Sequence, residues 1–503
     1  MAKHFQRFVF MPRTATPCTP EQFTFGRVES RDVIVNFNGG AVTSDAGLML
    51  IAALDQKRQI TARLAACFQD YRDPNRVEHS LETLIAQRIY GLVQGYEDLN
   101  DHDQLRHDPM FALALGKLSA SASVGAPMAG KSTLNRIEHC PETVANCQES
   151  RYHRIGHDPK AIEKLFVELF LESYSKPPQQ IVLDLDVTDD QVHGCQEQAF
   201  FNKYYNGVCY APLYIFCGKH LLAAKLRPAN VDPADGALEE LQRVIGLIQT
   251  QWPKTRILVR GDSAYSREEI MAWCESQRID YVFGLAGNAR LMRMSIDTQE
   301  KALAEYQQRQ QPVVSFLEQL FHPDEVVSAC QQLQSPVVRY RSLCYKTLDS
   351  WTRCRRVVTK VAYDAAGFNV RFVVTSLPAF KFPPGQLYTQ QYCPRGEMEN
   401  RFKEQQLELF SDRTSTHSNE CNQLRLWFSS LAYVLMNALR QSCLLTTELA
   451  SAQVGTIRSK LLKLGARVLI SVRRIQIAIS TGCPFQAVFA TAYQKLQTLP
   501  NTA

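Results

Sequence analysis

Three acidic residues that lie far apart in the sequence each stand where a carboxylate would be exposed for chemistry. Asp186 comes at the end of an apolar, strand-like run, Asp262 follows a second such run, and Glu399 lies in a segment that reads as the start of a helix. Hard Mg²⁺ ions prefer carboxylate oxygens. Two ions held about 3.5–4 Å apart can activate an attacking oxygen and stabilise a leaving one. The three residues therefore predict a two-metal site for phosphoryl transfer, in which Mn²⁺ can substitute for Mg²⁺.

The first strand carries a second carboxylate, Asp184, two residues before Asp186. Successive side chains of a strand alternate between its faces, so the two aspartates point the same way. Two like charges on a buried strand raise one pKa strongly unless cations lie nearby, which favours a bound metal; the alternative is an edge strand with one solvated face. Asp186 is the favoured ligand because it is nearer the carboxyl end of the strand, where open sheets place their sites. Asp184 remains the alternative.

The residues before Glu399 support its assignment to a functional site. Tyr392, Arg395 and Glu399 have the spacing i, i+3 and i+7, which places them on one face of a helix. A tyrosine, a guanidinium and a carboxylate aligned in this way can stack on a base, clamp a phosphate and bind a metal. The alternative interpretation is a solvated helix face with an Arg–Glu pair, and for Asp262 an ordinary turn after a strand.

Composition limits the class of protein. With 503 residues, 45% hydrophobic and 21% charged, the chain predicts two or three globular domains. The net charge is only +6, but residues 450–503 contain seven Lys or Arg and no Asp or Glu, which indicates a polyanionic partner or else a solvated basic face. The 15 cysteines lack zinc spacing and are odd in number, which predicts a reducing, cytoplasmic setting. No run of 18 uncharged apolar residues exists, so no membrane span is expected.

The hydrophobic pattern predicts an α/β fold with a mixed sheet after a helical first third. Strands are expected at 181–188, 207–217, 220–227, 256–260 and 280–285, with helices at 236–250 and 267–276. A hairpin through Gly218-Lys219 should join the second and third strands. Further on, alternating polarity predicts three antiparallel strands at 337–346, 355–363 and 368–376.

These features together resemble the DDE transposases of bacterial insertion sequences, in the group 1 branch with a Y-x2-R-x3-E signature. Tyr392, Arg395 and Glu399 match that spacing, and the resemblance covers roughly residues 30–475. One departure is Gln406, which stands where the family pattern continues to a lysine; Lys403, one turn after the glutamate, is the candidate substitute. The other stretches that carry the resemblance are Asp186–Thr188, Val259–Tyr265, Gly95–Asp103, Thr133–Glu138 and Phe200–Tyr205.

The resemblance implies an RNase H-like mixed-sheet catalytic core, with Asp186, Asp262 and Glu399 as catalytic residues and metal ligands, and with Tyr392, Arg395 and Lys403 as DNA contacts. It implies binding of double-stranded DNA at terminal inverted repeats and at a target, Mg²⁺-dependent cut-and-paste cleavage and strand transfer, a homodimer on DNA, and a bacterial, nucleoid-associated location. Trp351 could stack on an unpaired base, the alternative being an ordinary core tryptophan.

The expected organisation follows from the pattern and the resemblance together. It comprises a mainly helical DNA-binding region at 1–177, the two parts of the core at 178–290 and 386–445, a β-rich insertion at 291–385, and a basic helical C-terminal segment at 446–503.

Two other functions remain as alternatives. One is a DNA-binding protein derived from a transposase that has lost catalysis. The other is a P-loop ATPase, because Gly125–Ser132 matches G-x4-G-K-[ST], although the residues before it do not form a buried strand.

Overall fold

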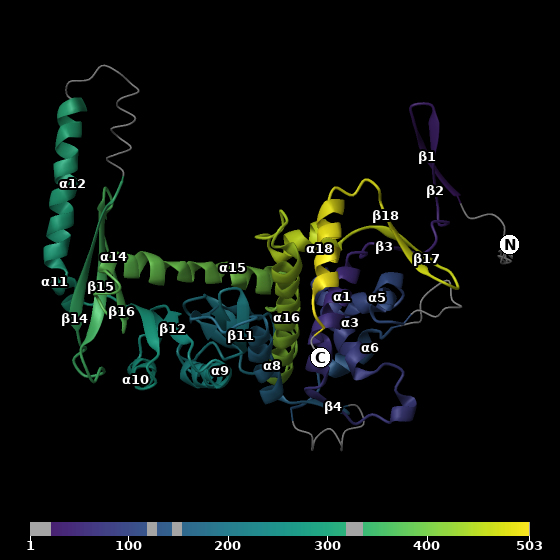
Figure 1. The fold of residues 1–503 in the computed structure, drawn as a ribbon, viewed down its shortest axis with the longest axis horizontal. Helices are drawn as coiled ribbons and strands as arrows, with labels where there is room; N and C mark the ends of the chain where they lie inside the picture. Colours follow the sequence, from purple (N-terminus) through teal and green to yellow (C-terminus); the bar gives the residue numbers. More distant parts are fainter. Residues whose placement is uncertain (1–21, 118–127, 143–152, 318–334, 502–503) are drawn as a thin grey trace, which may run out of the picture.

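A computed structural model of the protein describes residues 22–117, 128–142, 153–317 and 335–501. Its centre is an eight-stranded mixed sheet with the strand order β11-β10-β6-β12-β13-β16-β15-β14 (Figure 1). The first three strands along the chain, β6, β10 and β11, are antiparallel, and β12 and β13 run parallel to β6. This is the RNase H-like arrangement. The strand bounds are β6 Gln180–Val187, β10 Leu213–Cys217, β11 His220–Lys225, β12 Arg256–Gly261, β13 Asp280–Leu285, β14 Val337–Tyr345, β15 Arg355–Asp364 and β16 Gly367–Thr375.

The two faces of the sheet are covered differently. Leu183 and Leu185 of β6 are fully buried in a cluster with helices α8 (Pro159–Glu172), α9 (Ala237–Gln251) and α10 (Glu268–Ser276). On the opposite face lie a helical run at 384–408 and the long helix α16 (Asn419–Leu439). The alternation along β6 therefore turns its aspartates toward the helical run, as the strand period requires.

The three later strands join the core sheet. β14, β15 and β16 are antiparallel as predicted, and β16 pairs with β13, so they extend the sheet of the core and form no sheet of their own. Helices α11 (Ala289–Met294) and α12 (Ile296–Leu317) accompany them; Ala302 and Tyr306 of α12 pack on Val337 and Val361.

Trp351, between β14 and β15, is a core residue. Only 4% of it is exposed. Its ring packs against Tyr345 at a centroid distance of 5.5 Å, and the Arg355 guanidinium lies 5.4 Å from it. Of the two interpretations, the ordinary core tryptophan is therefore confirmed, because the ring is almost entirely buried and a base could not reach it.

The helical region before β6 packs on α16 (Figure 1). Helix α3 (Leu81–Gln94) is buried from Leu84 onward, whereas Leu81 at its start is half-buried. A two-stranded hairpin, β1 (Gln22–Val28) and β2 (Arg31–Asn36), stands away from this region. The other elements are α1 Leu48–Arg58, α2 Ile60–Ala65, β4 Phe68–Asp70, η1 Pro74–Arg76, η2 Leu99–Asp101, α4 His102–Leu105, α5 Pro109–Ala114, α6 Lys131–Glu138 and β5 Ile155–His157.

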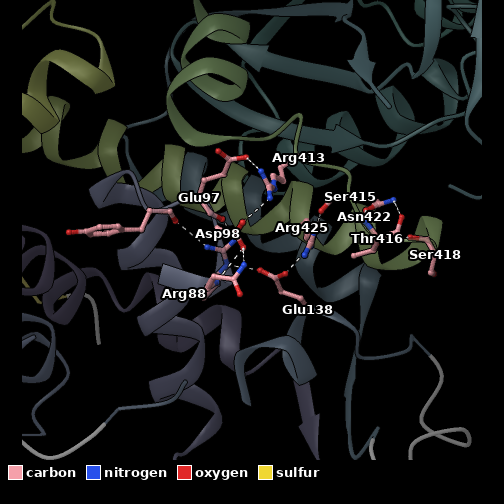
Figure 2. Close-up of polar contacts among 12 residues, drawn as sticks. Arg88, Glu97, Asp98, Glu138, Arg413, Ser415, Thr416, Ser418, Asn422 and Arg425 are labelled. Carbon is pink, nitrogen blue, oxygen red and sulfur yellow. Dashed lines mark hydrogen bonds and ion pairs between the residues drawn. The ribbon is translucent and has the colours of Figure 1, made fainter. Parts of the chain in front are cut away.

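Ion pairs fasten the helical region to α16 and the loop before it (Figure 2). Glu138 is fully buried; its two carboxylate oxygens pair with Arg88 of α3 at 2.5 Å and with Arg425 of α16 at 2.8 Å. Burial alone would raise the pKa of Glu138, but the two guanidinium groups hold it below its ordinary value. Arg413 pairs with Glu97 and Asp98 at 2.6 and 2.9 Å. Two of the short stretches that carry the family resemblance thus act at this joint.

The C-terminal segment is only partly helical, so the expectation for 446–503 is wrong in part. Strands β17 (Ala466–Ile470) and β18 (Ile475–Ile479) form an antiparallel pair, and β17 also pairs with β3 (Val42–Thr43). The helical parts of the segment are α17 Val454–Ile457, the π-helical turn η8 Arg458–Leu462 and α18 Gln486–Thr498. β-Branched residues stand at alternate positions, Val468 and Ile470 in β17 and Ile475, Ile477 and Ile479 in β18, which suits a half-buried strand.

Two further details complete the fold. The predicted strand 207–217 is interrupted at Pro212, and its first part, β9 (Gly207–Tyr210), pairs with β7 (Asp190–Gln191) and β8 (Phe200–Asn202). The predicted hairpin between β10 and β11 is confirmed. Among the described residues no helix is both long and apolar enough to span a membrane.

Candidate active site

Asp186 and Asp262 meet at the carboxyl ends of two neighbouring strands. β6 and β12 are parallel with Asp184 opposite Arg260, so Asp186 and Asp262 each lie two residues further on. Asp262 also accepts a hydrogen bond of 2.8 Å from the amide of Ala264, which caps the short helix η3 (Ser263–Tyr265). Both line a cavity of about 480 Å³.

Glu399 lines the same cavity, as does Arg395. The structure therefore brings all three predicted acids to one cavity, although 213 and 137 residues of sequence separate Asp186 and Asp262 from Glu399. Glu399 itself is exposed. The cavity is completed by Val187, Thr188, Asn202, Tyr204, Tyr205, Ala211, Arg227, Ala229, Val231, Pro233, Ser263, Ala264, Tyr265 and Phe402.

Asp186 is a mostly buried carboxyl group in contact with a guanidinium. Its side chain is 17% exposed, and Arg395 Nη1 lies 2.6 Å from its Oδ2. Burial is the largest influence and raises the pKa of Asp186 to about 6, with Asp262 adding to the rise and Arg395 opposing it. A mostly buried carboxylate with a second acid beside it is an unfavourable arrangement unless a cation is present.

Asp184 is engaged elsewhere. Arg260 donates through Nε and Nη2 to its two oxygens, the second at 2.8 Å, and also to the carbonyl of Gln391 at 2.7 Å. Asp184 lines a different cavity from Asp186. The sequence argument treated the two aspartates as one uncompensated pair, and this is corrected here, because each lies beside an arginine: Asp184 beside Arg260 and Asp186 beside Arg395.

The helical run that carries Glu399 is irregular. It passes from α14 (Pro384–Gln386) through the π-helical turn η4 (Leu387–Tyr392), the 3-10 helix η5 (Cys393–Glu397) and α15 (Met398–Lys403) to a second π-helical turn, η6 (Glu404–Glu408). The predicted single helix face is therefore only partly realised. Pro394 near the start of η5 has no amide hydrogen to donate, which favours a change of pitch there.

Only two of the three signature residues line the cavity. Arg395 and Glu399 line the cavity, whereas Tyr392 lies over β13, where a Cβ at Gly284 would come within 2.7 Å of its hydroxyl. Burial raises the pKa of Tyr392, and Asp262 adds to this. Lys403 is exposed outside the cavity. Position 284 thus needs glycine because the tyrosine and the Asp262 loop leave no room.

Several residues in and near the cavity were not singled out by sequence reasoning. Arg260, hidden inside an apolar strand, lines the separate cavity of Asp184. Tyr204 is 88% exposed at the cavity and lies in a stretch noted only for its resemblance to the family. The buried hydroxyl of Tyr265 has no hydrogen-bond partner among the described residues, and its pKa is raised well above its ordinary value by burial. The sequence signal that could have found Tyr265 is an aromatic residue shortly after the end of a strand and close to an acidic residue.

The donor chemistry of the cavity fits a hard divalent ion. Its acids are three carboxylates, the ligands that Mg²⁺ prefers. As the side chains stand, no three His, Cys, Asp or Glu residues within the described ranges are close enough together to hold a metal ion. The guanidinium of Arg395 fills the place beside Asp186 that a cation would take.

The P-loop alternative gains no support. The segment around Gly125 lies outside the described residues. Lys131 begins helix α6; its amide donates to Asp103 and its ammonium to Asn100, at 3.0 and 3.2 Å. These partners belong to the helical region and hold the lysine there.

A family model described as "Transposase DDE domain group 1" matches residues 25–501. No curated protein matches the chain. Among solved structures, a cryo-EM structure of a piggyBac transposase synaptic complex with hairpin DNA is similar at 10% sequence identity and a TM-score of 0.36, over 82% of this chain and 79% of that one.

Proposed function

The chain belongs to the transposases with a group 1 DDE domain, and from this premise we propose that it is the DNA transposase of a bacterial insertion sequence. It binds the terminal inverted repeats of the element and carries out metal-dependent DNA cleavage and strand transfer. The observation that carries the proposal is the convergence of Asp186, Asp262 and Glu399 on one cavity at the carboxyl ends of β6 and β12.

The roles follow from the positions. Asp186, Asp262 and Glu399 would hold two Mg²⁺ ions, or Mn²⁺ in their place, which supply the activation of an attacking oxygen and the stabilisation of a leaving oxygen. Arg395 lies at the same cavity, and a guanidinium there can pair with a phosphate through two parallel hydrogen bonds.

The other DNA contacts in this proposal lie around the cavity. Lys403 is exposed next to it and suits a phosphate contact, and Tyr392 adjoins Arg395. A cut-and-paste reaction needs two DNA ends held together, so the active form is a homodimer on DNA. The C-terminal segment supports a DNA path, because five of its seven basic residues are exposed: Lys460, Arg467, Arg473, Arg474 and Lys495.

The test is cleavage of a DNA fragment that carries the terminal repeat of the element, with Mg²⁺ and with EDTA. Wild type should cut only with the metal, and Asp262→Ala and Glu399→Gln should each abolish cutting. Glu397→Gln is the matched control, because Glu397 is exposed on the same helical run but lines a different cavity. It should cut like wild type.

Two other outcomes would contradict the proposal. Intact cleavage by Asp262→Ala would show that the site is assigned wrongly. Tight binding of the repeat without cleavage by wild type in any divalent ion would favour a transposase-derived protein that only binds DNA.

A further inference from the structure

Gln406 occupies the position where the family pattern has a lysine, and its side chain points into the protein. It lies on η6, seven residues after Glu399, and does not line the cavity. Its Nε2 donates to the carbonyl of Asp189 at 2.7 Å and to Oδ1 of Asp190 at 2.9 Å, and its Oε1 accepts from the hydroxyl of Thr188 at 3.4 Å. The amide thus uses both of its hydrogens and its oxygen on one turn of chain.

This turn of the chain follows directly after the first acid, Asp186. Thr188 is two residues after Asp186, and Asp190 opens the short strand β7. The contacts therefore connect the exit of β6 to the helical run that carries Glu399, although more than 200 residues separate the two.

Asp190 explains why a neutral partner suits this place. Its carboxyl is fully buried, and its Oδ2 has no hydrogen-bond partner among the described residues. Burial raises the pKa of Asp190 well above its ordinary value; the hydrogen bond from Gln406 opposes the rise, and the acidic Asp412 and Asp189 add to it. A protonated carboxyl and a primary amide can face each other without a buried charge, whereas a lysine would place one there.

We propose that Gln406 is a positioning residue of the active site, which ties the turn after Asp186 to the helical run of Glu399 and so sets the separation of these two acids. Gln406 does not bind DNA, and the neutral Gln406–Asp190 pair replaces the charged residue of the family pattern. The inference rests on the proposed function for its catalytic consequence. A displacement of about 1 Å between catalytic groups can cost roughly 100-fold in rate.

The test compares four variants in single-turnover cleavage of the terminal-repeat DNA and in DNA binding by fluorescence anisotropy. Gln406→Ala removes the three hydrogen bonds of the side chain, which form the tether. Gln406→Glu keeps the shape of the side chain but places a carboxylate oxygen, which accepts and does not donate, opposite the Asp189 carbonyl. Asp190→Asn keeps a neutral side chain of the same shape. Gln405→Met is the matched control, because Gln405 is buried on the same turn but its amide has no partner among the described residues.

Gln406→Ala and Gln406→Glu should slow cleavage by about 10- to 100-fold and change the DNA dissociation constant by less than about twofold. Asp190→Asn and Gln405→Met should cleave at a rate close to that of wild type. Weaker DNA binding by Gln406→Ala with an unchanged cleavage rate would overturn the proposal in favour of a DNA contact. Loss of cleavage in Asp190→Asn would show that the carboxyl acts as a charge.

A second readout needs no DNA or metal. Amide hydrogen exchange of residues 187–191 should be faster in Gln406→Ala than in wild type and unchanged in Gln405→Met. If wild type fails to cleave but this difference is found, the proposed function is wrong while the tether stands. If exchange is the same in all variants, the tether itself is refuted.

Discussion

Replacing Asp186 by asparagine should stabilise the metal-free protein while it removes a residue of the proposed site. Burial, opposed by Arg395 and reinforced by Asp262, raises the pKa of Asp186 from 3.8 to about 6. Each pKa unit corresponds to about 1.4 kcal/mol, so the ionised carboxylate costs the folded protein about 3 kcal/mol at neutral pH. Asparagine has the same shape without the charge. Asp186→Asn should therefore raise the free energy of unfolding by up to about 3 kcal/mol at pH 8.

The gain depends on pH in one direction. Below about pH 4 the carboxyl is protonated in both the folded and the unfolded chain, and wild type carries no penalty. Between about pH 4 and 6 the unfolded chain ionises first, so the stability of wild type falls as the pH rises, and above pH 6 the deficit is constant. The difference in the free energy of unfolding between Asp186→Asn and wild type should therefore grow as the pH rises from about 4 to 6.

The assay is urea unfolding in EDTA between pH 4 and 8, followed by tryptophan fluorescence. Three of the four tryptophans pack in the cluster on the sheet, so the signal reports the part of the chain that holds Asp186: Trp252, Trp273 and Trp351. Glu239→Gln, on the exposed face of α9, is the control and should change stability by less than about 0.5 kcal/mol. Equal stability of Asp186→Asn and wild type at pH 8, or the same gain at pH 4 as at pH 8, would refute the reasoning.

Three further predictions concern other contacts. Arg395→Gln should bind Mn²⁺ about tenfold more tightly than wild type without DNA, by electron paramagnetic resonance, because it removes a cation that lies 2.6 Å from Asp186; equal or weaker binding would contradict this. Glu138→Ala should lower the free energy of unfolding by about 3–5 kcal/mol, since two guanidinium groups lose their buried partner. Urea unfolding measures the change, and a loss below about 1 kcal/mol would contradict a stabilising role for the ion pairs of Glu138. Trp351→Ala should destabilise the protein by about 3–5 kcal/mol in the same assay, with no weakening of DNA binding at temperatures where it stays folded; a selective loss of DNA binding would restore the base-stacking hypothesis.

The sequence alone determined most of the core. The alternation at 181–188 predicted a strand whose two aspartates point the same way, and in β6 they lie on the face opposite the buried Leu183 and Leu185. The position of Asp262 just after a strand-like run was also readable, because strand ends are marked by local turn residues. These features depend on residues within a few positions of one another, and local periodicity records them.

The tertiary structure decided which groups meet. That Asp184 is matched by Arg260 follows from the register between β6 and β12, which no pattern within either strand specifies. The pairing of β16 with β13, and of β17 with β3 some 420 residues earlier, likewise joins backbone edges that are distant along the chain. Strand edges carry the same donors and acceptors whatever their side chains.

The same distinction explains the site. The spacing of Tyr392, Arg395 and Glu399 was visible in the sequence, but the changes of helical pitch along the run that carries them were not. The sequence showed a glutamine in place of lysine at position 406, and only the fold reveals the buried Asp190 that it faces. Residue types and short-range spacing determine which chemistry is available, whereas packing between distant segments determines the partner, the burial and hence the charge of each group.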